Sequence, residues 1–203
     1  MRRIISFTLV ALAALALSGC LGGRPIRYYT VEFPPAPKSS GAAFPITLLV
    51  GRIGAPEILK DEPIVYRSGR NEIGTYQYHQ WAEPPARMVK IMLMRRLRAS
   101  GEYQSVADLG SSAQGDFVLQ GSLYDFEEVD TRGIQALVSM EFELVDRKTH
   151  KTVWTHFYSH RETVQGKTIP DVVAALDRNL EQGLTQVASG LNAYFSAHLP
   201  AKL

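Results

Sequence analysis

This chain of 203 residues contains one cysteine, and the residues around it decide what chemistry its thiol can do. Cys20 ends the stretch LALSGC, which follows Arg2, Arg3 and an uncharged run over residues 4–17. A basic start, a short apolar run and small residues at the end are typical of a secretory signal peptide. A lone cysteine forms no internal disulfide and no thiolate metal site. A nucleophilic role would need a base and a shaped pocket, which the edge of a signal peptide does not offer.

The residues Leu-Ser-Gly-Cys at 17–20 resemble the lipobox of bacterial lipoproteins. In a lipobox the thiol accepts diacylglycerol, the peptide is cut before the cysteine, and the new amine is acylated. The resemblance predicts that residues 1–19 are a signal peptide and that lipidated Cys20 begins the mature chain; the alternative is an incidental cysteine. Two or more acyl chains hold a protein stably on a membrane. Leu21 follows instead of aspartate, which favours the outer membrane over retention in the inner membrane.

Two histidines are the second group of candidate functional residues, and the stretch that contains them is predicted to be a strand. His156 and His160 share one face with Glu162, which would supply a third metal ligand. Four residues along a strand separate two rings by about 13 Å, whereas metal–nitrogen bonds are about 2 Å long. We therefore interpret these residues as one face of an amphipathic strand and predict no metal site.

Basic residues gather on the predicted helix over residues 83–103, which has no acidic residue between positions 84 and 101. They would suit anionic lipid or an acidic partner, or they would form a solvated face that complements the helix dipole; the second interpretation is favoured. Trp81, just before this helix, is either a core anchor or an interface residue, and burial is the usual state of tryptophan. The candidate contact residues are Trp81, Arg87, Lys90, Arg95 and Arg98, with Arg96 as a further basic residue.

Other chemistry finds no support in the sequence. GRNEIG at 69–74 lacks the Lys-Ser/Thr ending of a phosphate-binding loop, and SGLNAYF lies within a predicted helix instead of a nucleophile elbow. Removing residues 1–19 removes two arginines, which leaves 20 basic against 20 acidic residues. A chain with equal numbers of basic and acidic residues has no excess of positive charge that would favour nucleic-acid binding. The sequence therefore predicts neither an enzyme nor a cofactor site.

The elements that would position these residues can be read from periodicity and turn signals. Short polar links predict an antiparallel meander of three strands, and the stretch IVYR-SGRN-TYQYHQW predicts a hairpin. Apolar residues at helical spacing predict a helix after Pro84 that ends at Gly101, and a long one after Pro170. The expected strands span residues 27–33, 46–53, 64–67, 75–81, 103–106, 116–128, 134–146 and 152–163, and the long helix spans 169–199.

The predicted fold is α/β (α+β), with two main helices against one mixed sheet, preceded by a tether over residues 20–26. Its domain spans residues 27–199. Gly183 and Gly190 lie within the long helix, where each costs about 1 kcal/mol of helix propensity. They either allow close packing or mark a bend.

The order of motifs resembles the ABC-type transport auxiliary lipoproteins, the family of paraquat-inducible protein C. The lipobox is followed by a Tyr-Tyr pair, a P-x-x-L segment, the IVYR strand and a W-x-x-P junction from Trp81 to Pro84. The helix then ends in L-x-x-S-G-x-Y, here Leu97, Ser100, Gly101 and Tyr103, and the stretches YDFE and WTHF come later. The resemblance covers nearly the whole mature chain, and its motifs are structural, not catalytic.

What this resemblance implies is a periplasmic domain similar to the N-terminal domain of TolB, without an active site. It implies partnership with an MCE-domain protein and an ABC-type permease in lipid movement between membranes. The domain would offer a docking surface to these partners, or to further copies of itself, through strand edges and helix faces. The alternative is an envelope-assembly lipoprotein that binds a cell-wall or polysaccharide machine.

Overall fold

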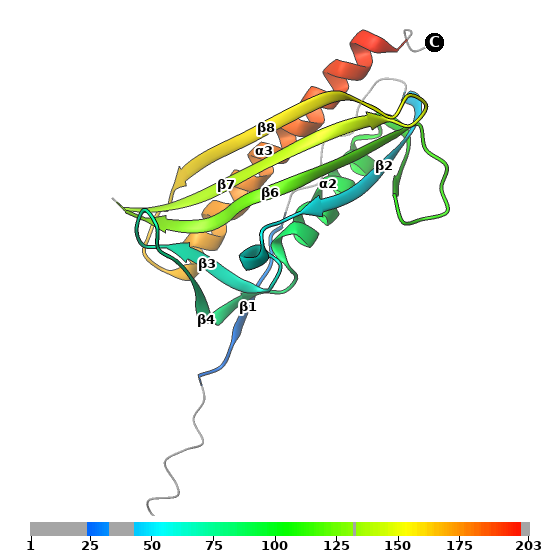
Figure 1. Cartoon of the computed structure of the whole chain (residues 1–203). Coiled ribbons are helices and arrows are strands. Elements are labelled where there is room, and N and C mark those ends of the chain that lie inside the picture. The colour runs from blue at the N-terminus through cyan, green and yellow to red at the C-terminus, as the bar shows by residue number, and fades with distance from the viewer. Residues whose placement is uncertain (1–23, 33–42, 132, 200–203) are drawn as a thin grey trace, which may run out of the picture.

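The computed structural model describes residues 24–32, 43–131 and 133–199, which form one mixed sheet with two long helices on one side of it (Figure 1). Cys20 and the predicted signal peptide lie outside the described residues. The strands are β1 (Arg27–Tyr29), β2 (Phe44–Gly54), β3 (Pro63–Arg67), β4 (Ile73–Trp81), β5 (Tyr103–Asp108), β6 (Phe117–Asp130), β7 (Ile134–Asp146) and β8 (Lys151–Thr163). The helices are the 3-10 turn η2 (Glu57–Leu59), α2 (Pro85–Ser100) and α3 (Ile169–His198). The predicted fold class is confirmed.

The meander of β6, β7 and β8 is antiparallel along its whole length, as predicted. In the register, Phe126 lies opposite Val138, and Leu144 lies opposite Trp154. Because side chains alternate between the two faces of a strand, one face of β7 is apolar and is covered by α3. Its side chains are fully buried: Ala136, Val138, Met140, Phe142 and Leu144.

Along its other edge, β6 pairs with two different strands. The sheet is therefore divided into two parts on this side of β6. Its first half pairs in parallel with β2, from Leu48 opposite Phe117 onward. Its second half pairs in parallel with β3, from Val65 opposite Glu127 onward. Beyond β2 lies β5, and beyond β3 lie β4 and then β1. A single continuous strand therefore joins the hairpin part of the sheet to the part that α2 covers.

Both helices begin where local sequence signals place them, and α2 also ends at such a signal. Pro85 occupies the first turn of α2, and Gly101 caps its C-terminus in the left-handed conformation at φ 66°, which glycine adopts without steric cost. Thr168 and Asp171 form a capping box at the start of α3, so that orphan N–H groups of the first turn have partners.

The two glycines in α3 allow close packing against the sheet. A Cβ atom at Gly183 would lie 2.8 Å from the Tyr158 ring and closer still to the Met140 methyl group. A Cβ at Gly190 would lie 2.9 Å from the Trp154 ring. The helix is continuous through both positions. The glycines therefore bring the helix axis toward β7 and β8, at the cost in helix propensity that glycine carries.

One polar residue of α3 is buried in this contact. Asn179 is fully buried, and its Nδ2 donates to the carbonyl oxygens of Ala136 (3.0 Å) and His160 (2.9 Å). Its Oδ1 accepts from the Tyr158 hydroxyl at 2.7 Å. Burial raises the pKa of Tyr158 to about 12, which keeps this hydroxyl a donor. Since buried polar groups are stable only when satisfied, this network fixes the position of the helix on the sheet.

Candidate docking surface

The basic residues of α2 are mostly paired with groups from other parts of the chain. Lys90 contacts Asp108 at 2.6 Å, which lowers the pKa of that carboxyl. Arg87 pairs with Glu83 at 3.1 Å, and Arg98 donates to the carbonyl oxygen of Val106. These partners lie before or after the helix in the sequence. A count of acidic and basic residues within the helix alone therefore does not include them. The pairing favours the solvated-face interpretation over a lipid patch.

The other two basic residues of α2 are Arg95 and Arg96. Arg96 is largely buried and lies 3.5 Å from Glu181 of α3. Arg95 is exposed and has no hydrogen-bond or ion-pair partner among the described residues. One exposed arginine without a described partner makes a weaker attraction for anionic lipid than the five basic residues of the sequence suggest.

Trp81 lies in the core. Its side chain is fully buried and packs on Phe126 with ring centroids 5.2 Å apart. It therefore offers no surface to a partner, and burial is the interpretation that the structure supports.

The histidines of β8 lie on its helix side, in separate aromatic contacts. His156 stacks on Trp154 with ring planes 3° apart, while His160 lies near Tyr158. Glu162 forms an ion pair with Arg178 of α3 at 2.7 Å. Across the part of the chain that the structure describes, no group of three or more His, Cys, Asp or Glu side chains could hold a metal ion.

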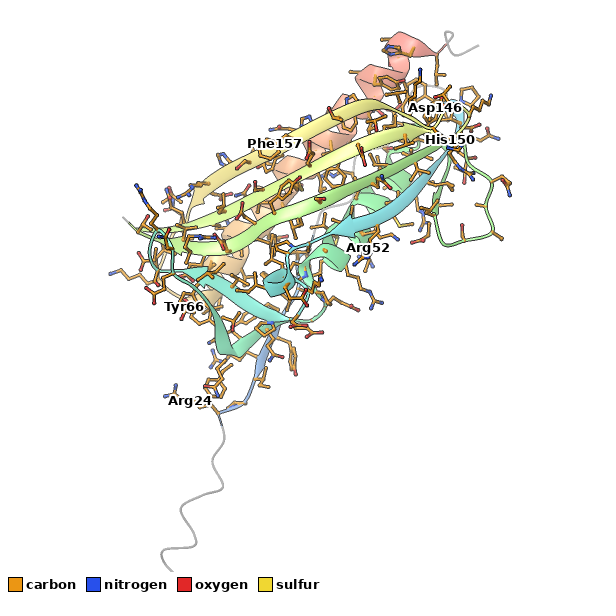
Figure 2. All side chains as sticks on the ribbon, viewed as in Figure 1. Arg24, Arg52, Tyr66, Asp146, His150 and Phe157 are labelled. Carbon is orange, nitrogen blue, oxygen red and sulfur yellow. The ribbon has the colours of Figure 1, made fainter. Side chains whose placement is uncertain are left out.

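The side of the sheet that faces away from both helices is the most distinctive surface of the domain (Figures 1 and 2). We name this side the open face. Side chains of β2, β6, β7 and β8 form its main part. No described helix covers it. Its residues include Arg52, Gln120, Tyr124, Glu141, Phe157 and Arg161.

An exposed aromatic pair lies in the middle of the open face. Phe157 of β8 is 60% exposed and Tyr124 of β6 is 45% exposed, and their ring centroids are 6.4 Å apart. The Tyr124 hydroxyl donates to Glu141 at 2.7 Å, which orients its ring. Large aromatic side chains on a polar surface are the residue types that dominate binding energy at protein interfaces.

A hollow of about 640 Å³ lies at one end of the open face, where the β3–β4 turn meets the meander. Its floor includes the apolar side chains of Val129 and Leu137. Arg70 and Arg161 line it, and neither makes an ion pair with a described residue. Arg67 also lines it but is held by buried Glu127 at 2.6 Å. Asp125 lines it as well, so the hollow combines apolar surface with two arginines unpaired with any described residue and one carboxylate.

A second hollow, of about 410 Å³, lies toward the other end of the open face and is more acidic. Glu141 and Glu143 line it together with Arg52. Gln120 and Thr152 donate to Glu143 at 2.7 and 3.1 Å, so this carboxylate is held in place. The open face thus carries unlike charges on either side of its aromatic centre, an arrangement that sets the register of a partner.

The open face was not among the predicted docking surfaces, which were strand edges and helix faces. The available signal was Phe157, a large apolar residue between Thr155 and Ser159 on the polar side of an alternating strand.

The chain that follows the predicted tether is fixed to the domain body near Asp177 of α3. The backbone N–H of Glu32 donates to Asp177 Oδ1 at 3.1 Å. Burial raises the pKa of Asp177 from its ordinary value of 3.8 to about 6, and this hydrogen bond opposes the rise. Between these two values the folded chain binds more protons than the unfolded chain, so the contribution of Asp177 to stability falls as the pH rises.

Asp177→Asn should therefore raise the free energy of unfolding at neutral pH, since the amide oxygen can still accept from Glu32. The gain should vanish near about pH 4, where the wild-type carboxyl is already protonated in the folded state. Urea unfolding at both pH values measures it. Asp171→Asn serves as a control of opposite sign, because the Thr168 hydrogen bonds lower the pKa of Asp171. A wild-type stability that exceeds that of Asp177→Asn at neutral pH would contradict this account.

Comparison with solved structures places this fold among known proteins. Protein XCC0632 from Xanthomonas campestris superposes with a TM-score of 0.75 at 19% identity, covering 84% of this chain and 98% of its own. An uncharacterized protein gives a TM-score of 0.67 at 15% identity, covering 83% and 99%. The hypothetical protein CT253 from Chlamydia trachomatis gives 0.52 at 7% identity, covering 76% and 100%. At these identities the likeness shows a shared fold.

Sequence comparison identifies the family. No curated protein matches the chain. The model of the ABC-type transport auxiliary lipoprotein component matches residues 29–188, from β1 to the second half of α3. This span includes the hairpin, α2, the whole meander and the larger part of α3. The chain therefore belongs to the family of ABC-type transport auxiliary lipoprotein components.

Proposed function

We propose that this protein is a non-catalytic accessory lipoprotein that docks a component of an MCE/ABC-type lipid transport system through the open face of its sheet. Its family supports a transporter as the partner and a membrane anchor in the cell envelope. The lipobox supports acylation of Cys20, and Leu21 after it supports the outer membrane. None of the described helices is long and apolar enough to cross a bilayer. The domain would then be held at the membrane by its acyl chains.

The observation that carries the docking proposal is the aromatic pair of Phe157 and Tyr124 on a surface that no described helix covers. An MCE-domain protein is the partner proposed, since the resemblance of the sequence implies it. Charged hollows on both sides of the pair would orient that partner, while the aromatic rings would supply most of the binding energy. The helix side of the sheet is occupied by the core, and the described residues form no comparable aromatic surface there.

Phe157→Ser should weaken capture of the MCE-domain protein about tenfold or more, as expected for loss of an interface hot spot. The side chain is largely exposed, so the fold should tolerate the change. Tagged wild-type and variant chains are purified in detergent from native membranes, and the recovered MCE-domain protein and permease are quantified. Leu109→Ser is the matched control, because Leu109 is 43% exposed and lies outside the open face.

Two outcomes would contradict this proposal in different ways. If Phe157→Ser recovers as much MCE-domain protein as wild type, the open face is not the docking surface. If wild type recovers no MCE-type or permease component, the transport partnership is wrong. Recovery of a cell-wall or polysaccharide synthase instead would favour the alternative function.

A further inference from the structure

The segment that follows the predicted tether carries an unusual set of exposed side chains. Ile26 is 44% exposed and Tyr28 is 63% exposed, which makes Tyr28 the most exposed large apolar side chain among the described residues. Arg24 and Arg27 are also exposed and make no ion pair with a described residue. The four residues thus place an aliphatic side chain, an aromatic ring and two positive charges within five positions.

These side chains are presented by a segment that is fixed to the domain. Strand β1 pairs in parallel with β4, with Arg27 opposite His79 and Tyr29 opposite Trp81. The Tyr29 hydroxyl and His79 Nδ1 are 2.9 Å apart, and Val31 is 1% exposed. The segment is therefore part of the sheet, and a surface that it contacts also orients the whole domain.

The anchor proposed at Cys20 lies very close to this segment in the chain. Only Leu21, Gly22 and Gly23 separate Cys20 from Arg24. At about 3.6 Å for each extended residue, Arg24 can lie at most about 14 Å from the acylated cysteine. The family match begins at residue 29 and leaves these positions out. Chain length alone therefore limits Arg24 to within about 14 Å of the acylated cysteine and Tyr28 to within about 29 Å.

We propose that Arg24, Ile26, Arg27 and Tyr28 form a second membrane contact, which lies in the headgroup region of an anionic lipid surface. The proposal rests on the acylation of Cys20 under the proposed function. Tyrosine prefers the membrane–water interface, where its ring is in apolar surroundings and its hydroxyl in water. The two arginines attract anionic headgroups. Ile26 and Tyr28 gain contact with acyl chains that they lack in water.

The lipidated chain is tested in vesicles of zwitterionic lipid that contain about a quarter anionic lipid. Ile26→Cys carries an environment-sensitive fluorophore, and a quencher is attached to the lipid. Acylation consumes the thiol of Cys20, so the introduced cysteine is the single labelling site. Leu109→Cys is the matched control, since Leu109 and Ile26 are 43% and 44% exposed. The probe at residue 26 should be quenched several-fold more than the probe at residue 109.

A second part of the experiment tests whether the positive charges of Arg24 and Arg27 contribute to the contact. Reversing both with Arg24→Glu and Arg27→Glu should reduce quenching at residue 26 to nearly the level seen without anionic lipid. Equal quenching at residues 26 and 109 in chains that float with the vesicles would overturn the second contact and leave the anchor intact. Chains that do not float with the vesicles would overturn the anchor and, with it, the contact that rests on it.

Discussion

Asn179→Leu is expected to lower the free energy of unfolding by about 2–4 kcal/mol, although leucine is close to asparagine in volume. The substitution removes the Nδ2 donor from the carbonyl oxygens of Ala136 and His160. The Tyr158 hydroxyl can still donate to the main-chain oxygen of residue 179, which lies 3.0 Å away. The cost therefore comes mainly from the two carbonyls, which are left without this donor in the contact between α3 and the sheet.

Urea unfolding measures this difference, and an unchanged slope with denaturant would show that stability alone has changed. Asn192→Leu is the matched control in the same helix. Asn192 is only half-buried and accepts one hydrogen bond, from the Tyr103 hydroxyl at 2.9 Å, so its loss should cost about 1 kcal/mol. Equal effects of the two substitutions would contradict the role given to the buried network.

Cys20→Ser should abolish the acyl anchor and, with it, fractionation with the outer membrane. A serine hydroxyl does not replace the thiol in the lipobox reaction, so neither acylation nor cleavage before residue 20 should follow. Without the two or more acyl chains that stable anchoring requires, the chain should appear as an uncut precursor or as a soluble protein. Density-gradient fractionation of the membranes and mass spectrometry of the N-terminus measure both effects.

Ser18→Ala is the control for this experiment, because it keeps a small residue in the lipobox and leaves the thiol in place. It should fractionate as wild type does. If Cys20→Ser also fractionates with the outer membrane, the acyl anchor is wrong. If wild type is acylated but fractionates with the inner membrane, the anchor is right and the sorting prediction is wrong.

The elements of this fold were predictable because their signals are local. Gly101 and Pro170 mark a helix end and a helix start through backbone geometry that few other residues suit. The alternation along β7 identifies its buried face. Short polar links specify antiparallel neighbours. In each case the deciding residues lie within one element or its turn.

The arrangement between elements depends on contacts that no local pattern records. The division of the β6 edge between β2 and β3 pairs residues 62 to 69 positions apart. The partners of Lys90 and Arg96 come from β5 and α3. Asn179 could have been noticed, since a polar residue between Leu176 and Leu180 interrupts the apolar face of the helix.

Strand β6 also sets the length of the sheet. It contains 14 residues, and at about 3.3 Å each it is about 45 Å long. One end pairs with the hairpin that carries β1, while the other lies beside β2 and β5 (Figure 1). In a chain seated on lipid through β1, as proposed, this length is the upper limit on how much farther from the lipid the β2–β5 end lies than the hairpin end.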